Sequence, residues 1–267
     1  MNKRIVELPT VREVIRCASN MYRLGWDERN GGNISVIIDP EEYRGYLPEK
    51  PVRTFELGFD ATPLIGRVFV VTGTGKYFKN VDYAPEVNLG IVRIGKDGRI
   101  AELLWGFEDG GRPTSEFPTH LMNHIARLSV NPKNHVVMHC HATHALALTY
   151  VLPEDEDEIT KTLWRMSTEC IVVFPEGVGH LPWMVCGGNE IGEATARKAL
   201  HYRVVFWGMH GIFAMGDDLD EAFGLVETVE KASQIYFLTQ DHVRQSITDE
   251  QLRKLAEAFK VDYKKII

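Results

Sequence analysis

The sequence predicts an α/β or mixed α+β fold, in which helices pack in layers around one β-sheet. Two observations lead to this prediction. Stretches with the composition of strands are interleaved with stretches of helical periodicity, and Gly, Asn and Asp turn signals typical of hairpins separate several of the strands. No internal repeat or obvious linker divides the 267 residues, a length that suits one large domain. We therefore expect a single domain over residues 1–267.

The N-terminal half is predicted to contain one helix followed by strands. Residues 10–22 begin with Thr10 and Glu13 at the spacing of a capping box, and apolar side chains follow at helical spacing. Strands are predicted at residues 34–39, 67–73, 89–95, 97–100 and 101–106. Residues 40–62 are rich in Pro, Glu and Tyr, so we expect an irregular excursion there.

The C-terminal half alternates predicted helices and strands. Helical periodicity is found at residues 113–128, 143–152, 159–167 and 219–240. Strand-like apolar runs occupy residues 135–141, 170–177 and 204–216. An acidic turn separates the second helix of this half from the third. This alternation favours helices on the faces of one sheet.

The composition is typical of a globular protein that binds a small molecule. With 44% hydrophobic and 25% charged residues the chain is not a disordered one, and no apolar run approaches membrane-spanning length. The formal net charge of −7, without a local Lys/Arg cluster, is not typical of a nucleic-acid-binding protein. We expect a small-molecule substrate, no nucleic-acid partner and no membrane association. An anionic substrate would have to be bound by local donors.

The N-terminus and the cysteines favour a cytoplasmic location. The first residues include basic side chains but no uninterrupted apolar core and no small-residue cleavage site. The four cysteines, Cys17, Cys140, Cys170 and Cys186, are scattered singly, which argues against a disulfide framework and against a cysteine-built zinc site. We expect reduced thiols, most of them buried.

Residues 135–150 contain four histidines in a pattern typical of an apolar strand followed by a helix. Alternate residues of a strand share a face, so His139 and His141 project together while Cys140 points the other way. Neutral imidazole is a common metal ligand. Two core histidines on one strand face would each need a separate polar partner. The pair therefore favours a metal site.

The spacing does not decide the third ligand of such a site. His144 begins the next helix and is rotated away from the strand face, while His135 lies on the same face but roughly 13 Å along the strand. His120 and His124 form an i, i+4 pair that suits a metal, but equally a solvated or packed helix face. His210 stands alone at the end of an apolar strand and can converge on the pair from a neighbouring strand.

Three short segments together outline a candidate phosphate site. Glycine-rich turns at residues 30–33 and 72–76 can turn backbone amides toward an anion, and Asn and Thr side chains add donors. Neither turn has the spacing of a Walker A loop, and each alone is more typical of a plain tight turn. Thr114 and Ser115 add hydroxyls at the predicted positive end of a helix.

Glu116 follows directly in that predicted first helical turn. A carboxylate there complements the helix dipole without any catalytic role. Next to a metal and a phosphate, however, it is a candidate general base that removes a proton beside a polarised carbonyl.

Six segments resemble, in this order, the class II (zinc-dependent) sugar-phosphate aldolases. They are DERNGGNIS (27–35), VTGTGKYFKNV (71–81), PTSEFP (113–118), MHCHATH (138–144), STECIVVFPEGVGHLPWMV (167–185) and MHGIF (209–213). The resemblance extends from the first helix to the long C-terminal one. HxH, PTSE and NGGN are shared across the superfamily, whereas the block 167–185 and the chain length favour one sugar-specific member.

The resemblance implies a fold, an assembly and a set of site residues. The fold would be a three-layer α/β/α arrangement with a central mixed, largely antiparallel sheet, in a homotetramer with sites at subunit interfaces. His139, His141 and His210 match the three zinc ligands, with one Zn²⁺ per subunit. Glu116 matches the carboxylate that binds the resting metal and acts as base, and Glu169 matches a carboxylate that reaches a neighbouring subunit's site. The matching phosphate-binding set is Asn30, Gly31, Asn33, Thr74, Gly75, Thr114 and Ser115.

The implied chemistry is the reversible cleavage of a sugar 1-phosphate to dihydroxyacetone phosphate and L-lactaldehyde through an enediolate. Glu116 would move the proton on carbon, and Glu169 the proton on the aldehyde oxygen. No lysine lies in a motif that indicates a Schiff base. The alternatives are a sister enzyme of the superfamily acting on another sugar phosphate and, more remotely, a noncatalytic adducin-like interaction module. The roles of Tyr263, in the C-terminal segment, and of residues 40–62 stay open.

Overall fold

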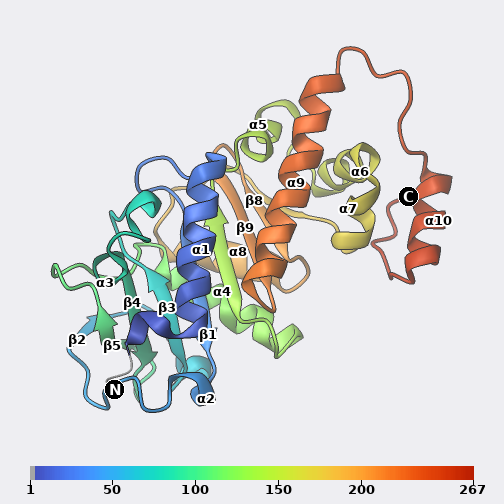
Figure 1. The fold of residues 1–267 in the computed structure, drawn as a ribbon. Helices are drawn as coiled ribbons and strands as arrows, with labels where there is room; N and C mark the ends of the chain where they lie inside the picture. The colour runs from blue at the N-terminus through green and yellow to red at the C-terminus, as the bar shows by residue number, and fades with distance from the viewer. Residues whose placement is uncertain (1–3) are drawn as a thin grey trace.

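One nine-stranded sheet runs through the computed structural model, which describes residues 4–267 (Figure 1). The strand order is β2-β5-β4-β3-β1-β6-β9-β8-β7. All neighbouring strands are antiparallel except β7 and β8, which are parallel. The expected mixed, largely antiparallel sheet is confirmed.

The strands and helices have the following bounds. The strands are β1 (Asn33–Ile38), β2 (Arg53–Glu56), β3 (Val68–Thr72), β4 (Leu89–Ile94), β5 (Ile100–Gly106), β6 (Val136–Cys140), β7 (Gly179–Leu181), β8 (Val204–Trp207) and β9 (Gly211–Gly216). The helices are α1 (Pro9–Leu24), α2 (Pro40–Tyr43), α3 (Pro85–Asn88), α4 (Phe117–Val130), α5 (Thr143–Val151), α6 (Glu156–Met166), α7 (Thr168–Val173), α8 (Asn189–Ala199), α9 (Leu219–Thr239) and α10 (Asp249–Phe259). Short 3-10 turns lie at Ile5–Glu7, Thr62–Leu64 and Phe78–Asn80.

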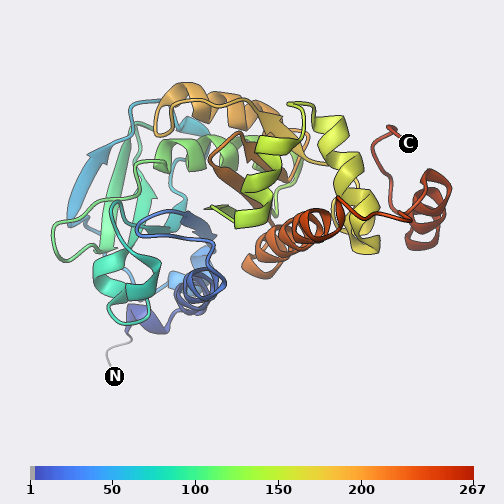
Figure 2. The ribbon, with the colours of Figure 1, turned by 90° about the horizontal axis from the view of Figure 1, so that it is seen from above.

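Helices cover both faces of the sheet and make three layers. Figure 2 shows α4 and α8 on one side, and α1 and α9 on the other. Alternate residues of a strand face opposite helix layers. Val137 of β6 packs in one cluster with residues of α4 and α8, whereas Met138 packs with residues of α1 and α9. The predicted three-layer α/β/α fold is confirmed.

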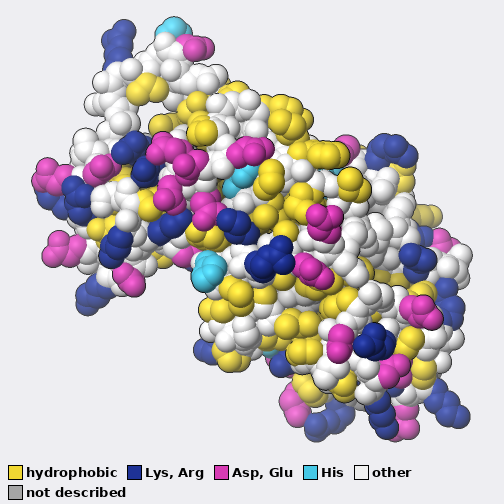
Figure 3. Space-filling view, turned by 180° about the vertical axis from the view of Figure 1, so that it is seen from behind, with side chains coloured by type: hydrophobic (Ala, Val, Ile, Leu, Met, Phe, Trp, Pro, Cys, Tyr) yellow, Lys and Arg dark blue, Asp and Glu magenta, His cyan; other side chains and the backbone are white. Residues whose placement is uncertain are grey.

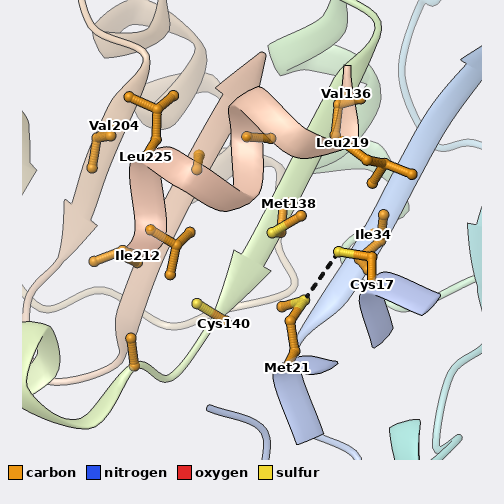
Figure 4. Packing of buried hydrophobic residues seen from close by; sticks show 14 of the residues in the cluster. Cys17, Met21, Ile34, Val136, Met138, Cys140, Val204, Ile212, Leu219 and Leu225 are labelled. Carbon is orange, nitrogen blue, oxygen red and sulfur yellow. Dashed lines mark hydrogen bonds between the residues drawn. The ribbon is translucent and has the colours of Figure 1, made fainter. Parts of the chain in front are cut away.

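The packing under β6 fixes which way its histidine points. Met138 and Cys140 lie against Met21 of α1 and Ile212 of β9 in the apolar cluster shown in Figure 4. Because the strand alternates, His139 must project to the opposite face, toward the layer of α4 and α8. The apolar residues of β6 therefore orient the polar one.

The first helix is confirmed, but its predicted capping box is wrong. The helix begins at Pro9 after Leu8, and no side chain caps its N-terminus. The amide and hydroxyl of Thr10 both donate to the Glu42 carboxylate, at 2.8 and 2.6 Å. The Glu42 carboxylate of α2 thus accepts the hydrogen bond from the Thr10 amide that the capping-box pattern had assigned to Glu13.

The strand predicted at residues 170–177 is also wrong, because residues 168–173 form helix α7. Cys170, Ile171 and Phe174 are buried, at spacings that match a helix rather than a strand. The β-branched residues of this run gave it a strand-like composition. The packing of α7 against α9 and α10 decides its conformation.

Residues 40–62 are more ordered than predicted. They contain the short helix α2 and the edge strand β2, whose Arg53 pairs with Leu103 of β5. The pattern also placed the start of α4 too early, since the helix begins at Phe117 and Thr114 and Ser115 precede it. Helices α8 and α10 and strand β7 were not predicted.

Three of the four cysteines are buried, as expected, and charges of both signs lie on the surface. On the face seen in Figure 3, acidic and basic side chains are interspersed. Along residues 4–267, no helix combines the length and apolar character needed to cross a bilayer. All four cysteines are free; Cys17, Cys140 and Cys170 are buried and Cys186 is exposed.

Candidate metal centre and active site

The imidazoles of His139, His141 and His210 form a near-equilateral triangle. Their ring centroids are 5.2, 5.0 and 5.1 Å apart. One nitrogen from each ring lies within 4.8 Å of the other two, a spacing that one metal ion can bridge. The structure thus brings His210 to the pair on β6.

Strand pairing explains why these residues meet. His139 lies opposite Phe213 of β9 and opposite Asn33 of β1. His141 directly follows β6, and His210 lies in the turn that connects β8 to β9. That turn is tight, and Met209 within it has the left-handed φ of 58°. Antiparallel pairing of β6 with β9 therefore places His210 beside the end of β6, close to His139 and His141.

Hydrogen bonds leave a free lone pair on two of these rings. His139 donates from Nδ1 to the carbonyl of Ile212 at 3.0 Å. Its Nε2 is buried and has no hydrogen-bond partner among the described residues. His141 Nδ1 lies 2.9 Å from both carboxylate oxygens of Glu28, and an ionised carboxylate can only accept. In the neutral form of each ring, Nε2 is therefore the unprotonated nitrogen, available to a metal.

The surroundings of His139 and His210 keep these two rings neutral. Burial lowers the pKa of His139 well below its ordinary value, and the neighbouring His141 and His210 lower it further. Burial, followed by the nearby His141, lowers the pKa of His210 to about 4. Neutral imidazole is the form that binds a metal, so both rings are ready to bind near neutral pH.

Glu116 lies beside the triangle. Its Oε2 is 3.9 Å from His139 Nε2 and accepts a hydrogen bond of 2.9 Å from Asn33 Nδ2. The residue is only 7% exposed. Burial raises the pKa of Glu116, against a lowering by the Asn33 hydrogen bond and by His141. A buried carboxylate with a raised pKa suits a general base.

These donors fit a metal ion. A buried nitrogen without a partner is costly in a folded protein, and a metal ligand bond would satisfy Nε2 of His139. The carboxylate of Glu116 adds a negative oxygen, and Cys186 adds a thiol that lies with Glu116 and His210 in a second group within 4.8 Å. No local pattern indicates that Cys186 lies at this site, since it is a lone cysteine.

Gly211 allows the rings to approach each other. A Cβ at this position would lie 2.4 Å from the carbonyl oxygen of Cys140 and 3.0 Å from the His141 ring. Such contacts would force the β6 and β9 backbones apart. Only glycine fits between the two strands that carry the ligands.

Replacing Gly211 with alanine is therefore expected to destabilise the protein by about 1–3 kcal/mol and to weaken metal binding. Urea unfolding of the metal-free protein and metal competition titration would measure the two effects. Gly224→Ala is the matched control, because nothing lies within 4 Å of a Cβ there and the residue is in the middle of α9. A Gly211→Ala protein as stable as the parent, with unchanged metal affinity, would contradict the assignment.

Glu28 is a site residue that was not predicted from the sequence, although it lies inside the DERNGGNIS segment. It holds the Nδ1–H of His141 and so fixes the tautomer of that ring. The hydrogen bond from His141 lowers the pKa of Glu28, against the opposing effect of burial. Its position next to a glycine turn gave no local signal of this contact.

Glu28→Gln is expected to lower metal affinity roughly 10- to 100-fold, because a neutral amide supports His141 less strongly than a carboxylate does. Competition with a chromogenic chelator would measure the change. Exposed Glu227→Gln on α9 serves as the control. An unchanged affinity in Glu28→Gln would remove this residue from the metal site.

The segments of the predicted phosphate set lie next to one another. Gly73 and Pro113 form an isolated bridge, and the Thr74 amide donates to the carbonyl of Arg112. A Cβ at Gly31 would lie 2.9 Å from the His141 ring, so the turn at residues 30–33 borders the histidines. Asn30, Ser115 and Gly75 are exposed, Gly31 and Thr74 partly so, and Asn33 and Thr114 buried.

The other candidate ligands lie elsewhere. His144 Nδ1 is 2.6 Å from Glu230, and His135 faces Asp39 at 4.0 Å. His120 and His124 are fully buried between α4 and the sheet. Spacing alone had left all four open.

Two further predicted residues lie away from the triangle. Glu169 is exposed in the first turn of α7, and it belongs to neither group of clustered ligand atoms found along residues 4–267. Tyr263 packs edge-to-face on Trp164 with ring centroids 6.4 Å apart, which ties the C-terminal segment to α6. Within a single chain, Tyr263 therefore packs against Trp164 and does not reach the histidines.

Residues 12–237 match the family described as "Class II Aldolase and Adducin N-terminal domain". The chain belongs to this family. Two relatives, both named rhamnulose-1-phosphate aldolase, match this chain over nearly its whole length. The protein from Listeria monocytogenes serotype 4a (strain HCC23) is 54% identical over 267 residues, covering 99% of this chain and 98% of the relative. That from Enterococcus faecalis (strain ATCC 700802 / V583) is 53% identical over 260 residues, covering 96% and 93%.

Solved structures agree with this membership of the class II aldolase family. A sugar-phosphate aldolase from Thermotoga maritima has a TM-score of 0.76 and 30% identity, over 88% of this chain and 97% of that one. An L-fuculose 1-phosphate aldolase has a TM-score of 0.61 and 22% identity, over 93% and 95%, which establishes a shared fold.

Proposed function

We propose that this class II aldolase is a Zn²⁺-dependent lyase that reversibly cleaves L-rhamnulose 1-phosphate to dihydroxyacetone phosphate and L-lactaldehyde in rhamnose catabolism. The observation that carries the proposal is the triangle of His139, His141 and His210 with Glu116 beside it. It occurs in a chain 54% identical, over 99% of its length, to a protein named for that reaction.

The three histidines would hold one Zn²⁺ per subunit, and Glu116 would complete the resting site. Imidazole and carboxylate ligands suit this ion, and three histidines leave a position for substrate. When bound, Zn²⁺ would act as a Lewis acid that stabilises the negative charge developing on the substrate oxygens.

The proton steps belong to two carboxylates. In the synthetic direction Glu116 removes a proton from the carbon beside the carbonyl of dihydroxyacetone phosphate, and the resulting enediolate attacks the aldehyde. In cleavage Glu116 returns that proton to carbon. Its position beside His139 and its raised pKa support this role.

The phosphate would be bound by the adjoining turns and the segment before α4. The backbone amide at Gly75 and the hydroxyls at Thr74, Thr114 and Ser115 would supply donors without a net positive charge. Gly31, whose own amide donates to the Glu28 carbonyl at 2.7 Å, would border the phosphate. Asn30 and Asn33 complete this set. The proximity of Gly73 to Pro113 and of Gly31 to His141 supports a single anion site beside the metal.

We further propose a cytoplasmic homotetramer in which Glu169 reaches the site of a neighbouring subunit and handles the proton on the aldehyde oxygen. Its exposure on α7 supports that assignment. The cytoplasmic location is supported by the buried free thiols, which suit a reducing compartment.

Mixed assemblies of Glu116→Gln and Glu169→Gln subunits should regain activity that neither variant has alone. Absence of this recovery would refute the shared site.

The sister reactions are less well supported. Identity is 22% to the L-fuculose 1-phosphate aldolase of known structure, against 54% to the rhamnulose-named relative. An L-ribulose-5-phosphate 4-epimerase would use the same metal and phosphate residues on another sugar. A noncatalytic adducin-like module would have no use for a buried, unpartnered imidazole nitrogen next to a buried carboxylate.

The direct test is incubation of the zinc-loaded protein with L-rhamnulose 1-phosphate. Dihydroxyacetone phosphate should form and be detected by coupled NADH oxidation, with L-lactaldehyde in equal amount. Failure to release either product would rule out the proposed function.

A further inference from the structure

A continuous chain of hydrogen bonds links Glu116 to the interior of the protein. Asn33 Nδ2 donates to Glu116 Oε2 at 2.9 Å, and Asn33 Oδ1 contacts His120 Nε2. Ser35 Oγ then lies 2.8 Å from His120 Nδ1 and 2.8 Å from His124 Nε2. All five residues are buried, and Ser35, His120 and His124 are 0% exposed.

The periodicities of β1 and α4 produce this alignment. Asn33 and Ser35 are two residues apart on one face of β1, a rise of about 6.6 Å. Glu116, His120 and His124 are spaced four apart along the start and first turns of α4, a rise of about 6 Å per step. The two rises nearly match, so each polar residue of the strand meets polar residues of the helix.

The direction of every hydrogen bond in this chain follows from Glu116. Its carboxylate can only accept, so Asn33 must present its amide nitrogen and turn Oδ1 toward His120. His120 then carries its proton on Nε2 and accepts at Nδ1 from the Ser35 hydroxyl. The Ser35 oxygen accepts from the Nε2–H of His124. His124 Nδ1 is left without a proton, and it has no hydrogen-bond partner among the described residues.

Both rings are held neutral within this chain. Burial lowers the pKa of His120 to about 3 and that of His124 well below its ordinary value. The rings therefore bring oriented donors but no charge. Burying a chain of polar side chains costs free energy relative to an apolar core. Glu116 is the one residue of this chain with a catalytic role, so the chain is expected to serve Glu116.

We propose that His120, Ser35 and His124 are positioning residues for Glu116. They hold the Asn33 amide in the one orientation that donates to the Glu116 carboxylate, and so keep that carboxylate aimed at the substrate carbon. This positioning role depends on the proposed function only because it requires Glu116 to be the catalytic base. It also gives Asn33 a second task besides the phosphate binding expected of it, because both ends of its amide are engaged in this chain.

The test compares His120→Leu with His120→Gln, which keeps an N–H donor near the position of Nε2. The readout is hydrogen–deuterium exchange at carbon in dihydroxyacetone phosphate without aldehyde, followed by NMR, together with metal content and thermal unfolding. His120→Leu should lower the maximal exchange rate roughly 10- to 100-fold while KM and bound metal change little. His120→Gln should restore most of the rate. His242→Leu, at an exposed histidine, is the matched control.

An undiminished exchange rate in folded, metal-loaded His120→Leu would overturn the proposal, and so would a folded His120→Gln that fails to restore the rate. Solid-state ¹⁵N NMR of histidine-labelled parent protein tests it without any substitution. His120 and His124 should both be neutral Nε2–H tautomers, and an Nδ1–H tautomer at His120 would contradict the chain. Absence of exchange in the parent would count against the proposed function, whereas the tautomers test the positioning chain alone.

Discussion

Glu116→Gln is expected to lower the rate of aldol cleavage by about 10²- to 10⁴-fold while leaving the metal in place. The amide has nearly the shape of the carboxylate but cannot accept a proton from carbon. The three histidines that converge at the site remain. Steady-state kinetics and elemental analysis of the same preparation would measure rate and metal content together.

The control for this experiment is Glu41→Gln, an exposed glutamate of α2 paired with Arg44. Its activity should equal that of the parent, because a surface ion pair contributes little. A metal-loaded Glu116→Gln enzyme with unimpaired turnover would remove Glu116 from the mechanism.

Removal of the metal is expected to abolish cleavage, with a loss of at least roughly 10³-fold, because several kcal/mol of charge stabilisation disappear with it. Added Zn²⁺ should restore the rate. His210→Ala should have the same effect without a chelator, since one of the three nitrogens is lost. Kinetics before and after treatment with dipicolinate, with metal analysis, would measure both.

The matched control for His210→Ala is His201→Ala, at an exposed histidine after α8. That variant should keep its metal and its rate. Activity that survives complete removal of metal, or a His210→Ala protein with full metal content and turnover, would contradict metal-dependent catalysis at this site.

Local pattern predicted two of the three histidines of the metal site, because strand alternation acts over two residues. It placed His139 and His141 on one side of β6, and the structure has both rings within 5.2 Å of each other. The meeting with His210 depends on β6 pairing with β9 across some seventy residues of chain. No local pattern contains that pairing. The resemblance named His210, and the sheet order gives the physical reason.

The errors in the predicted fold arose where distant contacts outweigh local preference. Residues 168–173 have a β-branched run, yet contacts with α9 and α10 make them helical. Thr10 follows the capping-box pattern, yet Glu42 from another helix binds it. In both cases a partner far along the chain determined the outcome.

The i, i+4 pair His120 and His124 illustrates the same limit at the site. Its spacing suited a metal, a solvated face or a packed face equally. Only the position of Ser35 on β1, 2.8 Å from both rings, distinguishes these alternatives. The pair is fully buried and hydrogen-bonded toward Asn33 and Glu116 rather than exposed.

The most direct test of the proposed reaction compares kcat/KM for L-rhamnulose 1-phosphate and L-fuculose 1-phosphate on one zinc-loaded preparation. Both sugars yield the same two fragments and differ in configuration at the carbon that becomes the aldehyde, so the comparison isolates recognition of the sugar. We predict a preference for L-rhamnulose 1-phosphate of roughly tenfold or more, about 1.4 kcal/mol. An equal or higher kcat/KM for L-fuculose 1-phosphate would contradict the proposed function.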